Sequence, residues 1–130
     1  MPVKRIIITV IALTTAGLHL VTGPDYAGPL PLFVNGYLID VLLPMTFFLL
    51  SGLFQAPVIS NLYFRLIGVW TGCAFVEAAQ YFGYPLFGST FDWFDLVAYG
   101  SGVMLGLLIE RYLLTRLPTA DQLTHDSERD

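Results

Sequence analysis

The chain has 130 residues, of which 55% are hydrophobic, 15% are aromatic and only 12% are charged. An ordinary soluble domain carries about 25% charged residues. With a mean hydropathy of +0.69, this sequence has too few polar side chains to cover a water-exposed surface of its size. It therefore excludes a soluble globule and predicts an integral membrane protein. The single cysteine, Cys73, excludes an internal disulfide and a cysteine-based metal framework.

Four apolar segments predict an all-α, four-helix membrane bundle, because each helical span takes about 20 residues. The expected spans are 6–22, 36–54, 62–82 and 93–114. The first span follows a basic start, as a signal peptide does, but its apolar run continues past a poor small-x-small cleavage region. We expect one transmembrane domain over residues 1–117 and a disordered acidic cytoplasmic tail over residues 118–130.

The connections between the spans contain turn and capping residues. Residues 23–35 are rich in proline and glycine and predict a loop. Asn61 and Asp92 precede the third and fourth spans and are expected to cap them, because short polar side chains bond the free N–H groups of a first turn.

The basic residues indicate the orientation of the bundle. They are Lys4, Arg5, Arg65, Arg111, Arg116 and Arg129. Four spans with these boundaries put all of them on one side, as the positive-inside rule requires, so both termini are expected to be cytoplasmic. Arg65 is expected to extend toward lipid phosphates at that side.

Two pairs of glycines at four-residue spacing suggest close helix packing. Gly68 and Gly72 lie in the third span, and Gly102 and Gly106 lie in the fourth. Because small residues let membrane helices approach closely, the pattern predicts contact between these two helices. A homo-oligomer through the same four glycines is equally compatible with it.

Polar residues that lipid does not tolerate lie at one depth of the predicted bundle. At a rise of about 1.5 Å per residue, they occupy the extracytoplasmic side. They are His19, Asp40, Glu77, Gln80, Asp92 and Asp95. The sequence thus predicts a ring of acids, an amide and an imidazole near the outer leaflet.

Some members of this ring have a structural explanation. Asp92 fits a helix cap with Asp95 at the third helical position, and both are close to the positive end of the helix dipole. Asp95 can cap and still point into a cavity. His19 near an interface is typical of an amphipathic side chain rather than a ligand.

Glu77 is different, because no helix end is close to it. A charge at the centre of a membrane helix costs about 2.5 to 3.5 kcal/mol. We expect Gln80, one turn further on the same face, to hydrogen-bond Glu77, and Asp40 and Asp95 to meet it across the bundle. Intramembrane ionisable residues are functional candidates by default, so Glu77 is the expected centre of a site.

The sequence has no recognised hydrolase, metalloprotease, nucleotide-binding or dinucleotide-binding motif. It also has no basic patch beyond the residues that set orientation, so no nucleic-acid partner is expected. Paired carboxylates can act as acid and base, which leaves catalysis open, but nothing in the sequence identifies a catalytic residue, a cofactor or a metal.

Two spaced motifs resemble the signature of VanZ-like bacterial membrane proteins. These are E-x-x-Q at Glu77 and Gln80, and D-x-x-D at Asp92 and Asp95, followed by the two glycines of the last span. Where the founding branch has an arginine and an asparagine, this sequence has Thr90 and Tyr99. These departures favour the uncharacterised branch of the family.

The resemblance implies a multi-pass protein of the bacterial inner membrane, related to one that lowers susceptibility to teicoplanin. It carries Glu77, Gln80, Asp92 and Asp95 over as the polar signature of the family and names no substrate.

Three functions therefore remain as hypotheses. The first is an outward-facing carboxylate pocket that binds a cell-envelope component, such as a lipid-linked or glycopeptide-type head group, or a cation. Its residues would be Glu77, Gln80, Asp95, Asp40 and Asp92. The second is a small proton- or cation-coupled transporter using the same acids. The third is a structural or assembly subunit of a membrane complex.

Overall fold

The computed structural model describes residues 3–22, 26–54, 56–84 and 92–116 of the chain. This part is all helical and contains no strand. Four helical segments in it are long and apolar enough to cross a membrane, as the composition predicts. The chain is thus a multi-pass membrane protein by helix length and hydropathy. The predicted tail at 118–130 lies outside the described residues.

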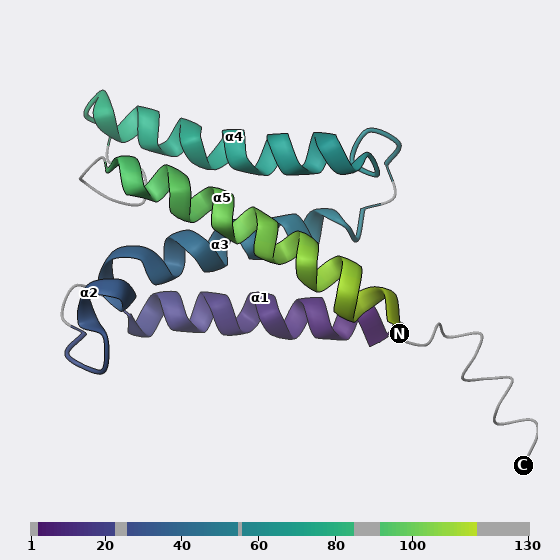
Figure 1. Ribbon diagram of the computed structural model, residues 1–130, viewed down its shortest axis with the longest axis horizontal. Coiled ribbons are helices and arrows are strands. Elements are labelled where there is room, and N and C mark those ends of the chain that lie inside the picture. The colour runs from purple at the N-terminus through teal and green to yellow at the C-terminus, as the bar shows by residue number, and fades with distance from the viewer. Residues whose placement is uncertain (1–2, 23–25, 55, 85–91, 117–130) are drawn as a thin grey trace, which may run out of the picture.

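The four spans run in alternating directions through the bundle (Figure 1). The first is α1 (Val3–Val21) and the third is α4 (Leu62–Tyr81). The second span, Pro31–Ser51, joins α2 (Pro31–Phe33), a π-helical turn (Val34–Leu38) and α3 (Ile39–Ser51). The fourth span, Trp93–Arg116, joins α5 (Trp93–Leu108), a second π-helical turn (Ile109–Leu113) and a 3₁₀ turn (Leu114–Arg116).

The second span begins earlier than predicted. Helix starts at Pro31, so the final part of the expected 23–35 loop is helical. Leu30 precedes it in a left-handed conformation with φ of 52°. Proline has a backbone angle suited to a first helical turn and needs no N–H partner there, so Pro31 starts this helix rather than belonging to a turn.

Both expected caps are present. The Asn61 side chain accepts hydrogen bonds from the N–H groups of Tyr63 at 2.9 Å and Phe64 at 3.2 Å. Asp92 accepts one from the Phe94 N–H at 3.0 Å. These bonds fix where α4 and α5 begin.

The helices α3 and α5 form the centre of the bundle, and α1 and α4 lie on either side of them (Figure 1). The tightest approach is at the glycines of α5. A side chain at Gly102 would overlap the Val41 carbonyl oxygen, and a Cβ at Gly106 would lie 2.9 Å from the Phe48 ring. Glycine is required here because two backbones meet without space for a Cβ atom.

The predicted role of the glycines is therefore correct only in part. The helices α4 and α5 do touch, but Gly102 and Gly106 pack against α3 and are buried in the chain. They are not available to a second copy, which corrects the four-glycine oligomer surface. Gly68 and Gly72 have nothing within 4 Å of an added Cβ and remain exposed.

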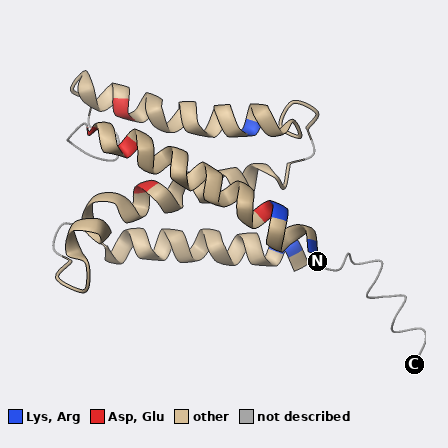
Figure 2. Ribbon diagram, in the orientation of Figure 1, with Lys and Arg blue, Asp and Glu red and all other residues tan. Residues whose placement is uncertain are grey.

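The charged residues of the described part separate toward the two ends of the bundle (Figure 2). Lys and Arg gather at the end that contains the start of α1, and we call this the basic end. The acids of α3, of α4 and of the start of α5 lie in the other half, which we call the acidic half; they are Asp40, Glu77, Asp92 and Asp95. Glu110 is the acid at the basic end.

Candidate functional site

Glu77 is the most deeply buried acid of the described residues. Only 2% of its surface is exposed. The hydroxyl of Tyr99, on α5, donates a hydrogen bond of 2.5 Å to Glu77 Oε1. The second carboxyl oxygen, Oε2, is buried and has no hydrogen-bond partner among the described residues. A buried polar atom without a partner costs free energy that a ligand able to donate would recover.

Asp40 and Asp95 lie near enough to Glu77 to interact with it electrostatically. Asp40, on α3, interacts electrostatically with Glu77 and lies near the Tyr99 side chain. Asp95, in the first turn of α5, interacts electrostatically with both Asp40 and Glu77. The carboxylate site, as we call it, consists of these three acids and Tyr99. It draws one residue from α3, one from α4 and two from α5.

Local helix geometry explains how these residues meet. Asp95 and Tyr99 are four positions apart on α5 and therefore share one face. Pro44 interrupts α3 one turn after Asp40. Because proline has no N–H, the Asp40 carbonyl does not receive the helical hydrogen bond that residue 44 would otherwise donate.

The remaining predicted site residues lie around the carboxylate site. Asp92 caps α5 and also interacts with Tyr37 and Asp95, so its capping role is confirmed. His19 is exposed on α1 and interacts electrostatically with Asp40. Gln80 is half-buried one turn beyond Glu77 and has an interaction of its own.

Tyr99 is the site residue that the sequence prediction did not assign. It is the hydrogen-bond donor to Glu77, a role that we expected of Gln80. A signal was present in the sequence, because a tyrosine one turn below Asp95 in a membrane span needs a partner for its hydroxyl. Only the packing of α5 on α3 and α4 identifies which acid that partner is.

A second polar cluster lies at the basic end. The guanidinium of Arg65 bonds Glu110 Oε2 at 2.7 Å, the Phe48 carbonyl at 2.8 Å and the Ser51 hydroxyl at 2.9 Å. It also lies over the Phe48 ring, 4.2 Å from its centroid. Lys4 approaches Glu110 Oε1 at 3.4 Å. We call Lys4, Ser51, Arg65 and Glu110 the Arg65 cluster.

The expected role of Arg65 was therefore wrong. Only 8% of the residue is exposed, and it does not extend to lipid phosphates. Instead it joins α3, α4 and the second π-helical turn, while Lys4 adds α1. The counter-charge Glu110 is 45 positions away in the sequence, so only the fold reveals the pair.

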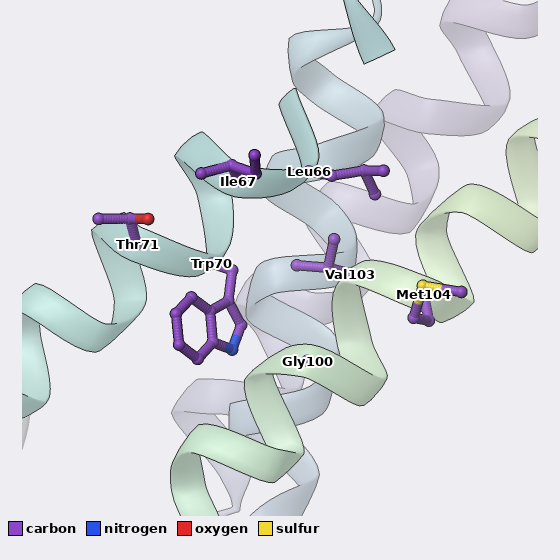
Figure 3. A pocket seen from close by; sticks show the side chains of 7 residues that line it. All are labelled: Leu66, Ile67, Trp70, Thr71, Gly100, Val103 and Met104. Atoms are coloured by element: carbon purple, nitrogen blue, oxygen red, sulfur yellow. The ribbon is translucent and has the colours of Figure 1, made fainter. Parts of the chain in front are cut away.

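An open apolar groove runs between α4 and α5, with a volume of about 400 Å³. Figure 3 shows its lining, in which the indole of Trp70 stands between the two helices. The lining residues are Leu66, Ile67, Trp70, Thr71, Gly100, Val103 and Met104. The Trp70 indole N–H donates a hydrogen bond of 3.2 Å to the Leu96 carbonyl of α5.

The described residues contain no group of three His, Cys, Asp or Glu side chains that could hold a metal ion.

Fold and site together define a multi-pass helical membrane protein with a buried carboxylate site in one half of its bundle. No family model, curated protein or solved structure matches the chain.

Proposed function

We propose that this chain is a VanZ-like protein of the bacterial inner membrane, and that its carboxylate site binds a cell-envelope component from the outer face. The head group would be of the lipid-linked or glycopeptide type. The basic end would face the cytoplasm, because positively charged residues favour that side. The acidic half would then lie in the outer leaflet.

The observation that carries this proposal is the unpaired Oε2 atom of Glu77. A residue that only joins helices is expected to have both oxygens satisfied, since burying an unpaired polar atom costs about 1–3 kcal/mol. Glu77 has one oxygen bonded to Tyr99 and the other without a donor among the described residues. An atom in that state is typical of a site that is completed by its ligand.

The neighbouring acids support the same function. Asp40 and Asp95 place two further carboxyl groups near Glu77, and the described Lys and Arg residues lie at the other end (Figure 2). Glu77 would be the central acceptor, with Tyr99 orienting its carboxyl group and Asp40 and Asp95 contributing further acceptors. Gln80 and Asp92 would complete the border of the site.

Thermal unfolding of the purified chain tests this function. The probes are soluble head groups of cell-envelope precursors, because a ligand that binds only the folded state raises the unfolding midpoint with concentration. We expect at least one probe to raise the midpoint of the native chain and to have no effect on Glu77→Gln.

The matched control is Glu110→Gln, which makes the same chemical change in the Arg65 cluster. It is expected to lower the starting midpoint and to keep the ligand-dependent rise. If no probe distinguishes native protein from Glu77→Gln, Glu77 joins helices and the binding function is wrong.

A structural or assembly subunit is the second candidate, and one observation favours it. The face of α4 around Gly68 and Gly72 is hollowed, with a volume of about 520 Å³, and has no partner within the described residues. Co-purification of a partner in a fixed ratio, lost in Gly72→Leu, would favour this function. A partner-free chain would count against it.

A further inference from the structure

The carboxylate site and the apolar groove lie along the same contact between α4 and α5. On α4, Leu66, Trp70 and Glu77 are separated by four and seven positions, so the three share one helix face. On α5, Tyr99 contacts Glu77, and the neighbouring Gly100 contributes to the groove. A ligand that reaches Glu77 from this side can therefore extend along the groove.

The groove and the carboxylate site differ in polarity. The groove is lined almost entirely by apolar side chains (Figure 3), of which Trp70 and Met104 are 40% and 52% exposed. About two turns along α4, at about 1.5 Å per residue, the buried oxygen of Glu77 lacks a donor. A ligand with a polar head group and an alkyl chain matches this arrangement, with the head group at Glu77 and the alkyl chain in the groove.

The acids of the site indicate which kind of polar head group a ligand would need. Glu77 interacts electrostatically with Asp40 and Asp95, and the exposed His19 interacts electrostatically with Asp40. A positively charged donor is favoured over a neutral one here, because hydrogen bonds between opposite charges are about twice as strong as neutral ones. Oε2 needs an N–H or O–H hydrogen, which a quaternary ammonium does not have.

We propose that the ligand is an amphiphile with a primary ammonium head group, which donates to Glu77 Oε2 while its alkyl chain lies in the groove between α4 and α5. This inference rests on the proposed function and deepens it, since it names the chemical class of the ligand. Lipid tails are as apolar as the groove, so the head group gives the affinity and the groove contributes through packing.

Quenching of Trp70 fluorescence by a brominated alkyl chain tests the placement of the chain. The full chain carries Trp93→Phe, so that Trp70 is the single tryptophan, and is held in phosphatidylcholine nanodiscs. The probe is bromoundecylamine, compared with its trimethylammonium analogue at equal bilayer content. We expect the primary amine to quench Trp70 at a severalfold lower content than the quaternary analogue.

Two variants separate the head group from the chain. Glu77→Gln removes the charged acceptor and is expected to abolish the difference between the probes. Gly100→Leu fills the groove, where an added Cβ meets Trp70 at an ordinary 3.6 Å, and is expected to abolish it as well. Gly17→Leu is the matched control on α1, where an added Cβ has nothing within 4 Å, and is expected to preserve it.

The outcomes distinguish this inference from the proposed function. Equal quenching by the two probes means that ordinary surrounding lipid occupies the groove and overturns the inference. A difference that survives Glu77→Gln overturns it too. If Glu77→Gln abolishes the difference in quenching and Gly100→Leu preserves it, the alkyl chain does not lie in the groove. That result overturns the inference and leaves the proposed function in place. Failure of the proposed function is read separately, from the thermal unfolding with soluble probes.

Discussion

The ion pair between Arg65 and Glu110 gives a prediction about the stability of the whole bundle. Its side chains are only 7% and 18% exposed, and Arg65 also bonds Ser51 and the Phe48 carbonyl. Removing one partner of a buried pair costs about 3–5 kcal/mol, because the other charge is left without compensation. Glu110 is partly exposed, so we expect Glu110→Gln to lower the free energy of unfolding by about 3 kcal/mol, at the lower end of that range.

Two further variants provide the comparison for this prediction. Lys4 lies 3.4 Å from the same carboxylate but is 36% exposed, so Lys4→Gln is expected to cost less than about 1 kcal/mol. The double variant Arg65→Met with Glu110→Leu removes both charges and is expected to recover most of the loss, as apolar replacements of buried pairs commonly do.

Unfolding by increasing mole fractions of sodium dodecyl sulfate in mixed micelles, followed by circular dichroism, measures these differences. Equal losses for Glu110→Gln and Lys4→Gln would refute the reasoning. A double variant that is less stable than Glu110→Gln would refute it as well. The attraction within the ion pair would then exceed the free energy that the two charges lose on leaving water.

Two other predictions follow from the packing of α5. Tyr99→Phe removes the hydrogen bond to Glu77 and is expected to cost about 1–3 kcal/mol in the same unfolding assay; an unchanged stability would mean that the bond is not formed in the membrane. Gly102→Ala is expected to cost about 1–3 kcal/mol, because its Cβ would overlap the Val41 carbonyl oxygen. Gly68→Ala, on the exposed face of α4, is expected to cost nothing or to stabilise the helix slightly, and a similar loss in both glycine variants would contradict the assigned packing.

The sequence predicts the class of fold because lipid imposes simple rules. A span needs a long apolar segment, and a helix start needs a cap, so the four spans and the caps at Asn61 and Asp92 follow from local sequence. The start at Pro31 does not follow as easily, because proline both breaks helices and begins them. A turn at Pro31 and a helix that begins at Pro31 are therefore both compatible with the local sequence.

The polar contacts of the bundle depend on which helix faces meet. Depth alone predicts that Asp40, Glu77 and Asp95 share a level, and these three acids do interact. Depth does not identify Tyr99 as the donor, nor Glu110 as the partner of Arg65. Those pairs are fixed by the rotation of each helix about its axis, which a single sequence with apolar residues on every face does not specify.

Infrared difference spectroscopy tests most directly whether the Glu77 carboxyl group receives a hydrogen-bond donor from a ligand. Spectra of the native chain and of Glu77→Gln would be recorded before and after addition of bromoundecylamine or of a probe that raises the unfolding midpoint. We expect the native chain to show a ligand-induced change in a carboxyl band that is absent from Glu77→Gln. Identical difference spectra from the two proteins would contradict the binding of a donor at Glu77.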